Sequence, residues 1–101
     1  MVKIGGHEIQ EILANVAGEY VFYLNDGRIL RNVAELKDAL NTMSDELYAY
    51  HVNSEKNDFN NWVKDIICDE KLAHDLLKAR DRAAAAKVTT QRLAFLIGKM
   101  K

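Results

Sequence analysis

The most regular alternation of apolar and polar residues begins directly after Asp58. Apolar residues there recur at intervals of three and four, which places them on one face of a helix, and the polar residues between them fall on the opposite face. The apolar face comprises Phe59, Trp62, Val63, Ile66 and Ile67. We expect this face to lie in the core, with Trp62 buried at its centre.

The same periodicity predicts an N-terminal amphipathic helix within residues 1–18. It runs from His7 to Ala17, with Gly6 before it and Gly18 after it as a glycine cap. The residues expected to face inward are Ile9, Ile12, Leu13 and Val16.

Three further helices begin at polar residues that suit an N-cap. Asn32 is followed three positions later by Glu35, the pattern of a capping box, and Ser44 and Asp69 precede two other periodic stretches. The inward-facing residues are Val33, Leu36, Leu40 and Met43 in the first helix, Leu47, Tyr50 and His51 in the second, and Leu72, Leu76 and Ala79 in the third.

A β-hairpin is predicted between the first two of these helical regions. Residues 20–24 are rich in residues that favour β-strands, and residues 28–31 hold Ile29 and Leu30 between two arginines. The intervening Asn25, Asp26 and Gly27 supply the positive-φ residues that a tight turn requires.

The last segment, residues 80–100, is predicted to be one long basic helix, because it contains no proline and carries four consecutive alanines. Its apolar residues fall on two sides. Leu93, Leu96, Ile97 and Met100 form one side, and Val88 and Phe95 form the other. A helix that is apolar on two sides needs two neighbours. These six residues are therefore candidate interface residues of a homo-oligomer or of a complex with another protein.

Together these elements predict one α+β domain spanning residues 1–101. A β-hairpin packs against about five helices, the last of them long, because an isolated hairpin is marginally stable and needs helical cover.

Composition restricts the environment of the chain. The hydrophobic content of 49% and the charged content of 29% are those of an ordinary globular protein. Apolar runs are far shorter than the roughly 20 residues that cross a bilayer, and residues 1–6 lack a signal-peptide core. We therefore expect a cytoplasmic protein with no membrane partner. The single cysteine, Cys68, excludes an internal disulfide and is expected to be a small buried thiol.

Charge is distributed unevenly along the chain. Residues 1–77 hold 7 basic and 14 acidic residues, a balance of −7, whereas residues 78–101 hold 7 basic and 1 acidic residue, a balance of +6. A basic tail can attract nucleic acid. The tail cations are nevertheless divided between two sides of the predicted helix: Lys78, Arg82, Arg92 and Lys99 on one, and Arg80, Lys87 and Lys101 on the other. This division argues against nucleic-acid binding.

An ordered set of short motifs from about residue 22 to residue 78 resembles an uncharacterised prokaryotic family, the domain of unknown function numbered 5752. The motifs are Asp26-Gly27-Arg28, residues 32–36, Tyr50-His51-Val52, Asp58-Phe59 with Trp62 and Asp65, and Asp69-Glu70 with Leu72-Ala73. The resemblance implies an intracellular bacterial or archaeal module, and it implies no activity, ligand or catalytic residue.

The polar loop between two predicted helices is the candidate ligand-binding site. It holds His51, Asn53, Asn57 and Asp58. A histidine and an aspartate across such a loop can pair to orient a general base or a ligand. Alternatively, His51 ends one helix, and Asn57 or Asp58 caps the next.

No complete catalytic, metal-binding or cofactor-binding motif occurs in the sequence, so we assign no catalytic residue and expect no metal or cofactor. The favoured function is a non-enzymatic protein-interaction or oligomerisation module. A small enzyme or ligand-binding domain that uses the polar loop is the first alternative, and a nucleic-acid-associated protein that uses the basic helix is the second.

Overall fold

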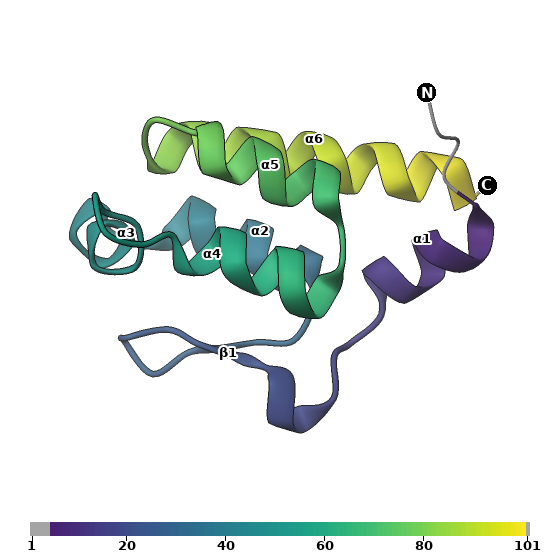
Figure 1. Cartoon of the computed structure of the whole chain (residues 1–101), viewed down its shortest axis with the longest axis horizontal. Helices are drawn as coiled ribbons and strands as arrows, with labels where there is room; N and C mark the ends of the chain where they lie inside the picture. The colour runs from purple at the N-terminus through teal and green to yellow at the C-terminus, as the bar shows by residue number, and fades with distance from the viewer. Residues whose placement is uncertain (1–4, 101) are drawn as a thin grey trace.

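Six α-helices and one antiparallel pair of strands make up residues 5–100, the part of the chain that the computed structural model describes (Figure 1). The elements in chain order are α1 (Gly6–Leu13), the 3-10 turn η1 (Gly18–Tyr20), β1 (Phe22–Tyr23), β2 (Ile29–Leu30), α2 (Val33–Thr42), α3 (Asp45–His51), α4 (Asp58–Trp62), the π-helical turn η2 (Val63–Ile67), α5 (Glu70–Lys78) and α6 (Arg82–Met100). The predicted hairpin and long C-terminal helix are confirmed, and the fold is α+β with mainly helical content.

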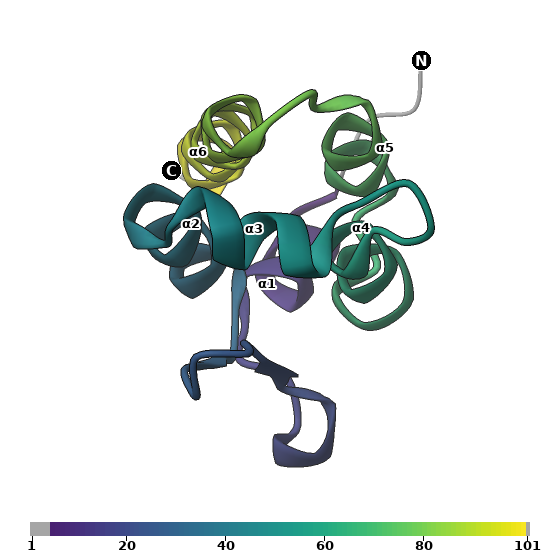
Figure 2. The same cartoon turned by 90° about the vertical axis from the view of Figure 1, so that its left-hand side faces the viewer.

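The long helix α6 organises the helical body, because it packs against α1, α2 and α5. Seen end-on, α6 and α5 lie next to each other above α2 and α4, and the hairpin projects from the opposite side (Figure 2). Helix α5 has 9 residues and α6 has 19, so α5 covers only part of the length of α6.

The core draws on every α-helix and on the hairpin. Trp62 is 7% exposed, which confirms its predicted burial, and its indole N–H donates to the carbonyl of Tyr20 at 2.8 Å. Phe22 of the hairpin contacts the rings of Trp62 and Phe59. The largest fully buried side chains are Ile9, Val33, Leu36, Leu40, Phe59, Val63, Leu72, Leu76, Thr89 and Leu96.

The hairpin is shorter than predicted and has one buried and one exposed face. Phe22 pairs with Leu30 on the core side, and Tyr23 pairs with Ile29 on the solvent side. Gly27 adopts a φ of 97°, a conformation that glycine accepts without a steric cost.

A charged side chain supports the turn of the hairpin. The Asp26 carboxylate accepts a hydrogen bond from the backbone N–H of Arg28 and another from its guanidinium. These bonds lower the pKa of Asp26, the backbone bond most of all.

Side-chain N-caps open five of the helices, each by accepting a hydrogen bond from a backbone N–H three residues later. The caps are Asn32, Ser44, Asn57, Asp69 and Asp81. Asn32, Ser44 and Asp69 begin helices as predicted, and α6 begins after Asp81 rather than at residue 80.

The N-terminal region differs from the prediction. Residues 1–4 lie outside the described part of the chain, and α1 ends at Leu13 instead of continuing to residue 17. Val16 instead donates its N–H to the carbonyl of Arg31 at 2.8 Å, which ties this segment to the end of the hairpin. Tyr20, predicted to begin the first strand, belongs to η1.

Two predicted burials are wrong. In α3 the inward aromatic residue is Tyr48, and Tyr50 is exposed. Cys68 is also exposed, because η2 widens the end of the preceding helix and Cys68 stops it in the left-handed conformation, with φ 66° and ψ 35°. The N–H of Cys68 bonds the carbonyl of Val63, five residues earlier, which is the hydrogen-bond spacing of a π-helical turn. The general tendency of cysteine to be buried, on which the prediction rested, does not take this turn into account.

Candidate functional site

The structure brings His51 and Asp58 together, which is one of the two arrangements that the sequence left open for the polar loop. His51 is the last residue of α3 and Asp58 is the first of α4, and the Nδ1 atom of His51 lies 2.9 Å from the Oδ2 atom of Asp58. The Nε2 atom accepts a hydrogen bond of 3.1 Å from the backbone N–H of Asn25 in the hairpin turn. An accepting Nε2 carries no proton, so the neutral ring holds its proton on Nδ1 and donates it to Asp58.

The imidazole is 4% exposed and is surrounded by aromatic rings. Its centroid lies 5.2 Å from that of Phe22, 5.4 Å from that of Phe59 and 5.0 Å from that of Tyr50. Both ring nitrogens are occupied by partners within the chain. In this arrangement the ring presents no free atom to a substrate or a ligand.

Lys56 completes the charged part of the loop. Its Nζ atom lies 3.0 Å from the Oδ2 atom of Asp58 and 4.8 Å from the centre of the Tyr50 ring. The side chain of Asp58 is therefore shared between a buried imidazole and a surface cation. Lys56 and the outer part of Asp58 are accessible to solvent, and so is the ring of Tyr50.

The side chains of Asn53 and Asn57 form hydrogen bonds with backbone groups. Asn57 is the cap of α4, accepting from the N–H of Asn60, and its amide donates to the carbonyl of Leu76 in α5. Asn53 accepts from the N–H of Glu55 and donates toward carbonyls at the end of α3. Of the two alternative caps, Asn57 therefore fills the role, and Asp58 instead holds His51. The four residues form a tie between α3, α4, α5 and the hairpin.

A second polar pair, which the sequence reasoning missed, joins α5 to α6. The guanidinium of Arg92 donates two hydrogen bonds, of 2.8 and 3.0 Å, to the carboxylate of Asp69, whose side chain is 2% exposed. Asp69 was recognised from the sequence as a helix cap, and Arg92 was assigned to the basic surface of the last helix. No residue pattern near Asp69 or Arg92 in the sequence indicates that these two side chains pair, because they are 23 positions apart.

The candidate interface residues of α6 divide differently from the prediction. Leu93 and Leu96 are buried in the core of their own chain, and Val88 is partly buried against it. Phe95, Ile97 and Met100 are exposed. The predicted division into two apolar sides is therefore wrong, and Leu93 and Leu96 are not accessible to a partner.

The short length of α5 explains why Val88 is covered and Phe95 is not. Asp69 immediately precedes α5 and pairs with Arg92 of α6. Helix α5 therefore extends along α6 only as far as about Arg92. Phe95 lies about one turn further along α6. Its ring is 45% exposed, with the guanidinium of Arg92 5.3 Å and the Nζ atom of Lys99 5.5 Å from its centre.

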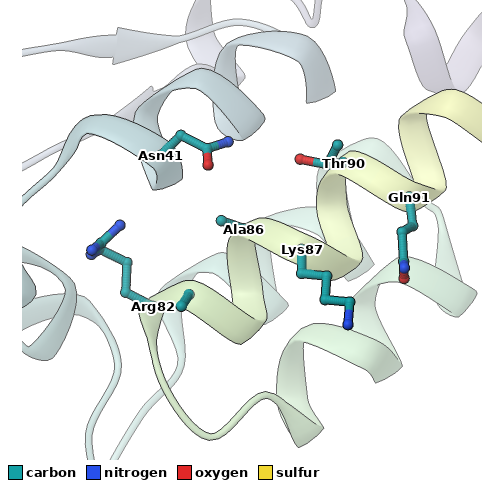
Figure 3. Close-up of a pocket in the computed structure, with 7 residues that line it drawn as sticks. Asn41, Arg82, Ala86, Lys87, Thr90 and Gln91 are labelled. Atoms are coloured by element: carbon teal, nitrogen blue, oxygen red, sulfur yellow. The ribbon is translucent and has the colours of Figure 1, made fainter.

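A groove lies beside α6. It has a volume of about 300 Å³ and lies between the end of α2 and the first half of α6. Thr90 points its hydroxyl toward Asn41, with Ala86 between them, whereas Lys87 and Gln91 point away from α2 (Figure 3). Its lining residues are Asn41, Arg82, Ala83, Ala86, Lys87, Thr90 and Gln91.

Two of the tail cations are engaged within the chain. Arg82 donates to the carboxylate of Asp45 and to the carbonyl of Leu40, and Arg92 is bound to Asp69. This removes two of the four cations that the sequence placed on one side of the helix, and so weakens the nucleic-acid alternative further. Across residues 5–100, no three histidine, cysteine or acidic side chains gather closely enough to bind a metal ion.

Comparison of the chain with protein-family models, with curated proteins and with solved structures finds no match. The resemblance to the domain of unknown function numbered 5752 thus rests on the sequence motifs and stays a prediction. Within residues 5–100, none of the helices combines the length and the apolar content needed to span a bilayer.

Proposed function

We propose that this chain is a small, non-enzymatic interaction module of the cytoplasm that associates through the C-terminal half of α6. The observation that carries the proposal is Phe95, a large aromatic side chain that is 45% exposed on the stretch of α6 beyond the reach of α5. Ile97 and Met100 are exposed in the same last turns. Aromatic residues, phenylalanine included, are enriched at the cores of protein interfaces.

The partner favoured by charge is a second copy of the chain. Lys99 lies 5.5 Å from the centre of the Phe95 ring, whereas the charge of Arg92 is balanced by Asp69, so a surface complementary to this end of α6 carries acidic groups. Residues 1–77 of the same protein supply them, with a balance of −7 against +6 for residues 78–101. Direct contact between two Phe95 side chains would bring the two Lys99 side chains together. Contact of the α6 end with the acidic body of the partner avoids this repulsion.

Light scattering on the full chain tests the proposal. We expect an oligomer at micromolar concentrations that weakens as salt is added, because screening reduces attraction between exposed charges. Phe95→Glu should give a monomer, whereas the matched variant Thr90→Glu, on the side of α6 that faces α2, should remain an oligomer.

Two results contradict the proposal. If the wild-type protein is monomeric, a second copy of the chain is not the partner. If Phe95→Glu still forms the oligomer, the interface does not include Phe95. Truncation after Ala79 is not a valid test, because it would delete Ala85, Thr89 and Leu96, all of which are fully buried.

A further inference from the structure

We propose that His51 is a proton-sensitive latch, which holds the hairpin turn on the helical body while its ring is neutral and releases Asn25 when Nε2 takes up a proton. This inference is independent of the association through α6. It rests on the position of one buried ring between the hairpin, α3 and α4.

The latch depends on the acceptor role of Nε2. The bond from the N–H of Asn25 to Nε2 spans 26 residues of sequence and links the turn to the end of α3. A protonated imidazole has N–H groups at both nitrogens and no acceptor. Protonation would therefore set two donors against each other at 3.1 Å and remove the bond.

Asp58 determines which nitrogen is affected. It accepts from Nδ1 at 2.9 Å, so the proton of the neutral ring stays on that side and the free lone pair faces the hairpin. A second proton can enter only at Nε2. The ring then remains bound to Asp58 on α4 while the hairpin loses its partner.

The ionisable groups around His51 lie on α4, on the loop before it, on the hairpin and on α3. Asp58 of α4 contacts the ring directly, and Lys56 of the loop offsets part of its charge from 3.0 Å. In the hairpin turn next to Asn25, the charged groups Asp26 and Arg28 are paired with each other at 2.9 Å. Tyr50 of α3 meets the imidazole with its ring edge. The carboxylate of Asp58 thus keeps the imidazolium bound to α4 and does nothing to retain Asn25.

The release would be local to the turn. The base of the hairpin is held separately, by the Trp62 bond to the carbonyl of Tyr20 and by the N–H of Val16 bonded to Arg31. Near the tip, the bond from Arg28 to Thr42 lies at the surface, where water competes with it. Opening would expose Leu24, which is buried against the helices in the closed form.

The experiment follows the His51 ring and the backbone amides of the full chain by nuclear magnetic resonance between about pH 8 and pH 5, the interval in which histidines ordinarily change charge. At the upper end, ring nitrogen shifts should show the proton on Nδ1. As His51 becomes protonated, the hydrogen-exchange protection of the Asn25 amide should fall by about tenfold, as expected for one lost hydrogen bond. The amide of Val16 should keep its protection.

Two variants make the test specific. His51→Gln places a side-chain oxygen near Asn25 that does not titrate in this range, so the loss of protection at Asn25 should disappear. His74→Gln is the matched control, since His74 is exposed on α5 and its replacement should leave the transition unchanged.

Three outcomes overturn the proposal. His51 becomes protonated while Asn25 stays protected, His51 stays neutral until the whole chain unfolds, or the Asn25 transition persists in His51→Gln. The first two are read from the wild-type protein, so the proposal can fail even if the glutamine variant does not fold.

Discussion

Asp69 and Arg92 form a two-pronged ion pair at the point where α5 begins against α6, with hydrogen bonds of 2.8 and 3.0 Å. The same carboxylate caps α5 by accepting from the N–H of Leu72. One side chain therefore fixes both the start of α5 and its position along α6.

Replacing Arg92 with methionine should destabilise the protein by about 3 kcal/mol, because it leaves the Asp69 carboxylate buried without its cation. Asp69→Asn in the Arg92→Met background should recover part of the loss, since asparagine keeps an oxygen for the cap but carries no charge. Urea denaturation measures both variants. Lys87→Met on the same helix is the control and should stay within about 0.5 kcal/mol of the wild type. An equally small effect of Arg92→Met would show that the pair contributes little.

Trp62→Ala should cost about 3 to 5 kcal/mol, because it removes a large buried ring from the centre of the core. Trp62→Phe keeps most of the ring and loses the N–H that binds the carbonyl of Tyr20, so we expect a smaller loss of about 1 to 2 kcal/mol. Thermal melts followed by circular dichroism compare the two. A melt of Trp62→Ala close to that of the wild type would be inconsistent with the burial of Trp62.

Asn57 has two bonds that substitution can separate. Asn57→Ala loses both the cap to the N–H of Asn60 and the donation to the carbonyl of Leu76, and should cost about 1 to 2 kcal/mol. Asn57→Asp keeps an acceptor for the cap and loses only the donor. In urea denaturation, the difference between Asn57→Asp and the wild type measures the link from α4 to α5, and the difference between the two variants measures the cap. Equal stability of Asn57→Asp and the wild type would assign the whole effect to the cap.

Cys68→Gly should stabilise the protein by about 0.5 to 1 kcal/mol, because a side chain at φ 66° meets steric strain that glycine avoids. Cys68→Ala keeps the Cβ atom and with it the strain, so it is the matched control and should be nearly neutral. Denaturant titration under reducing conditions compares them. If alanine and glycine have the same effect, removal of the thiol, rather than relief of the backbone, is responsible.

Burial raises the pKa of Tyr48 above its usual value of 10.0, and the charge of Asp81 adds to the effect. Above pH 10 the unfolded chain loses this proton while the folded chain keeps it. The contribution of Tyr48 to stability is thus fully present below pH 10 and is lost as the pH rises through the raised pKa. Tyr48→Phe should flatten the alkaline fall in stability measured by denaturant titration. Tyr23→Phe, at an exposed position, should not.

The sequence predicted those parts of the fold that local chemistry specifies. The cap at Asn32, the burial of Trp62 and the turn at Gly27 follow from side chains close to one another in the chain. The pair of His51 and Asp58 was one of two arrangements that the sequence left open, since only a short loop separates the two helix ends. These features need no knowledge of how distant segments pack.

The features that the sequence did not predict depend on distant or backbone partners. His51 accepts from the backbone N–H of Asn25, a group that every residue except proline carries. No pattern of side chains therefore identifies Asn25 as the partner. Arg92 is an ordinary exposed cation until α5 is placed beside α6. The exposure of Cys68 follows from a π-helical turn, a change of hydrogen-bond register that apolar spacing does not encode.

The ties between the hairpin and the helices also set an order of events during synthesis. Tyr20 and Asn25 are bonded to residues that come 42 and 26 positions later in the chain, Trp62 and His51. At a translation rate of about 5 to 20 residues per second, Trp62 is made roughly 2 to 8 seconds after Tyr20. During that interval the apolar face of the hairpin has no α4 to pack on, and a two-stranded hairpin alone is marginally stable. The nascent chain therefore leaves the ring of Phe22 without its aromatic partners until α4 has been synthesised.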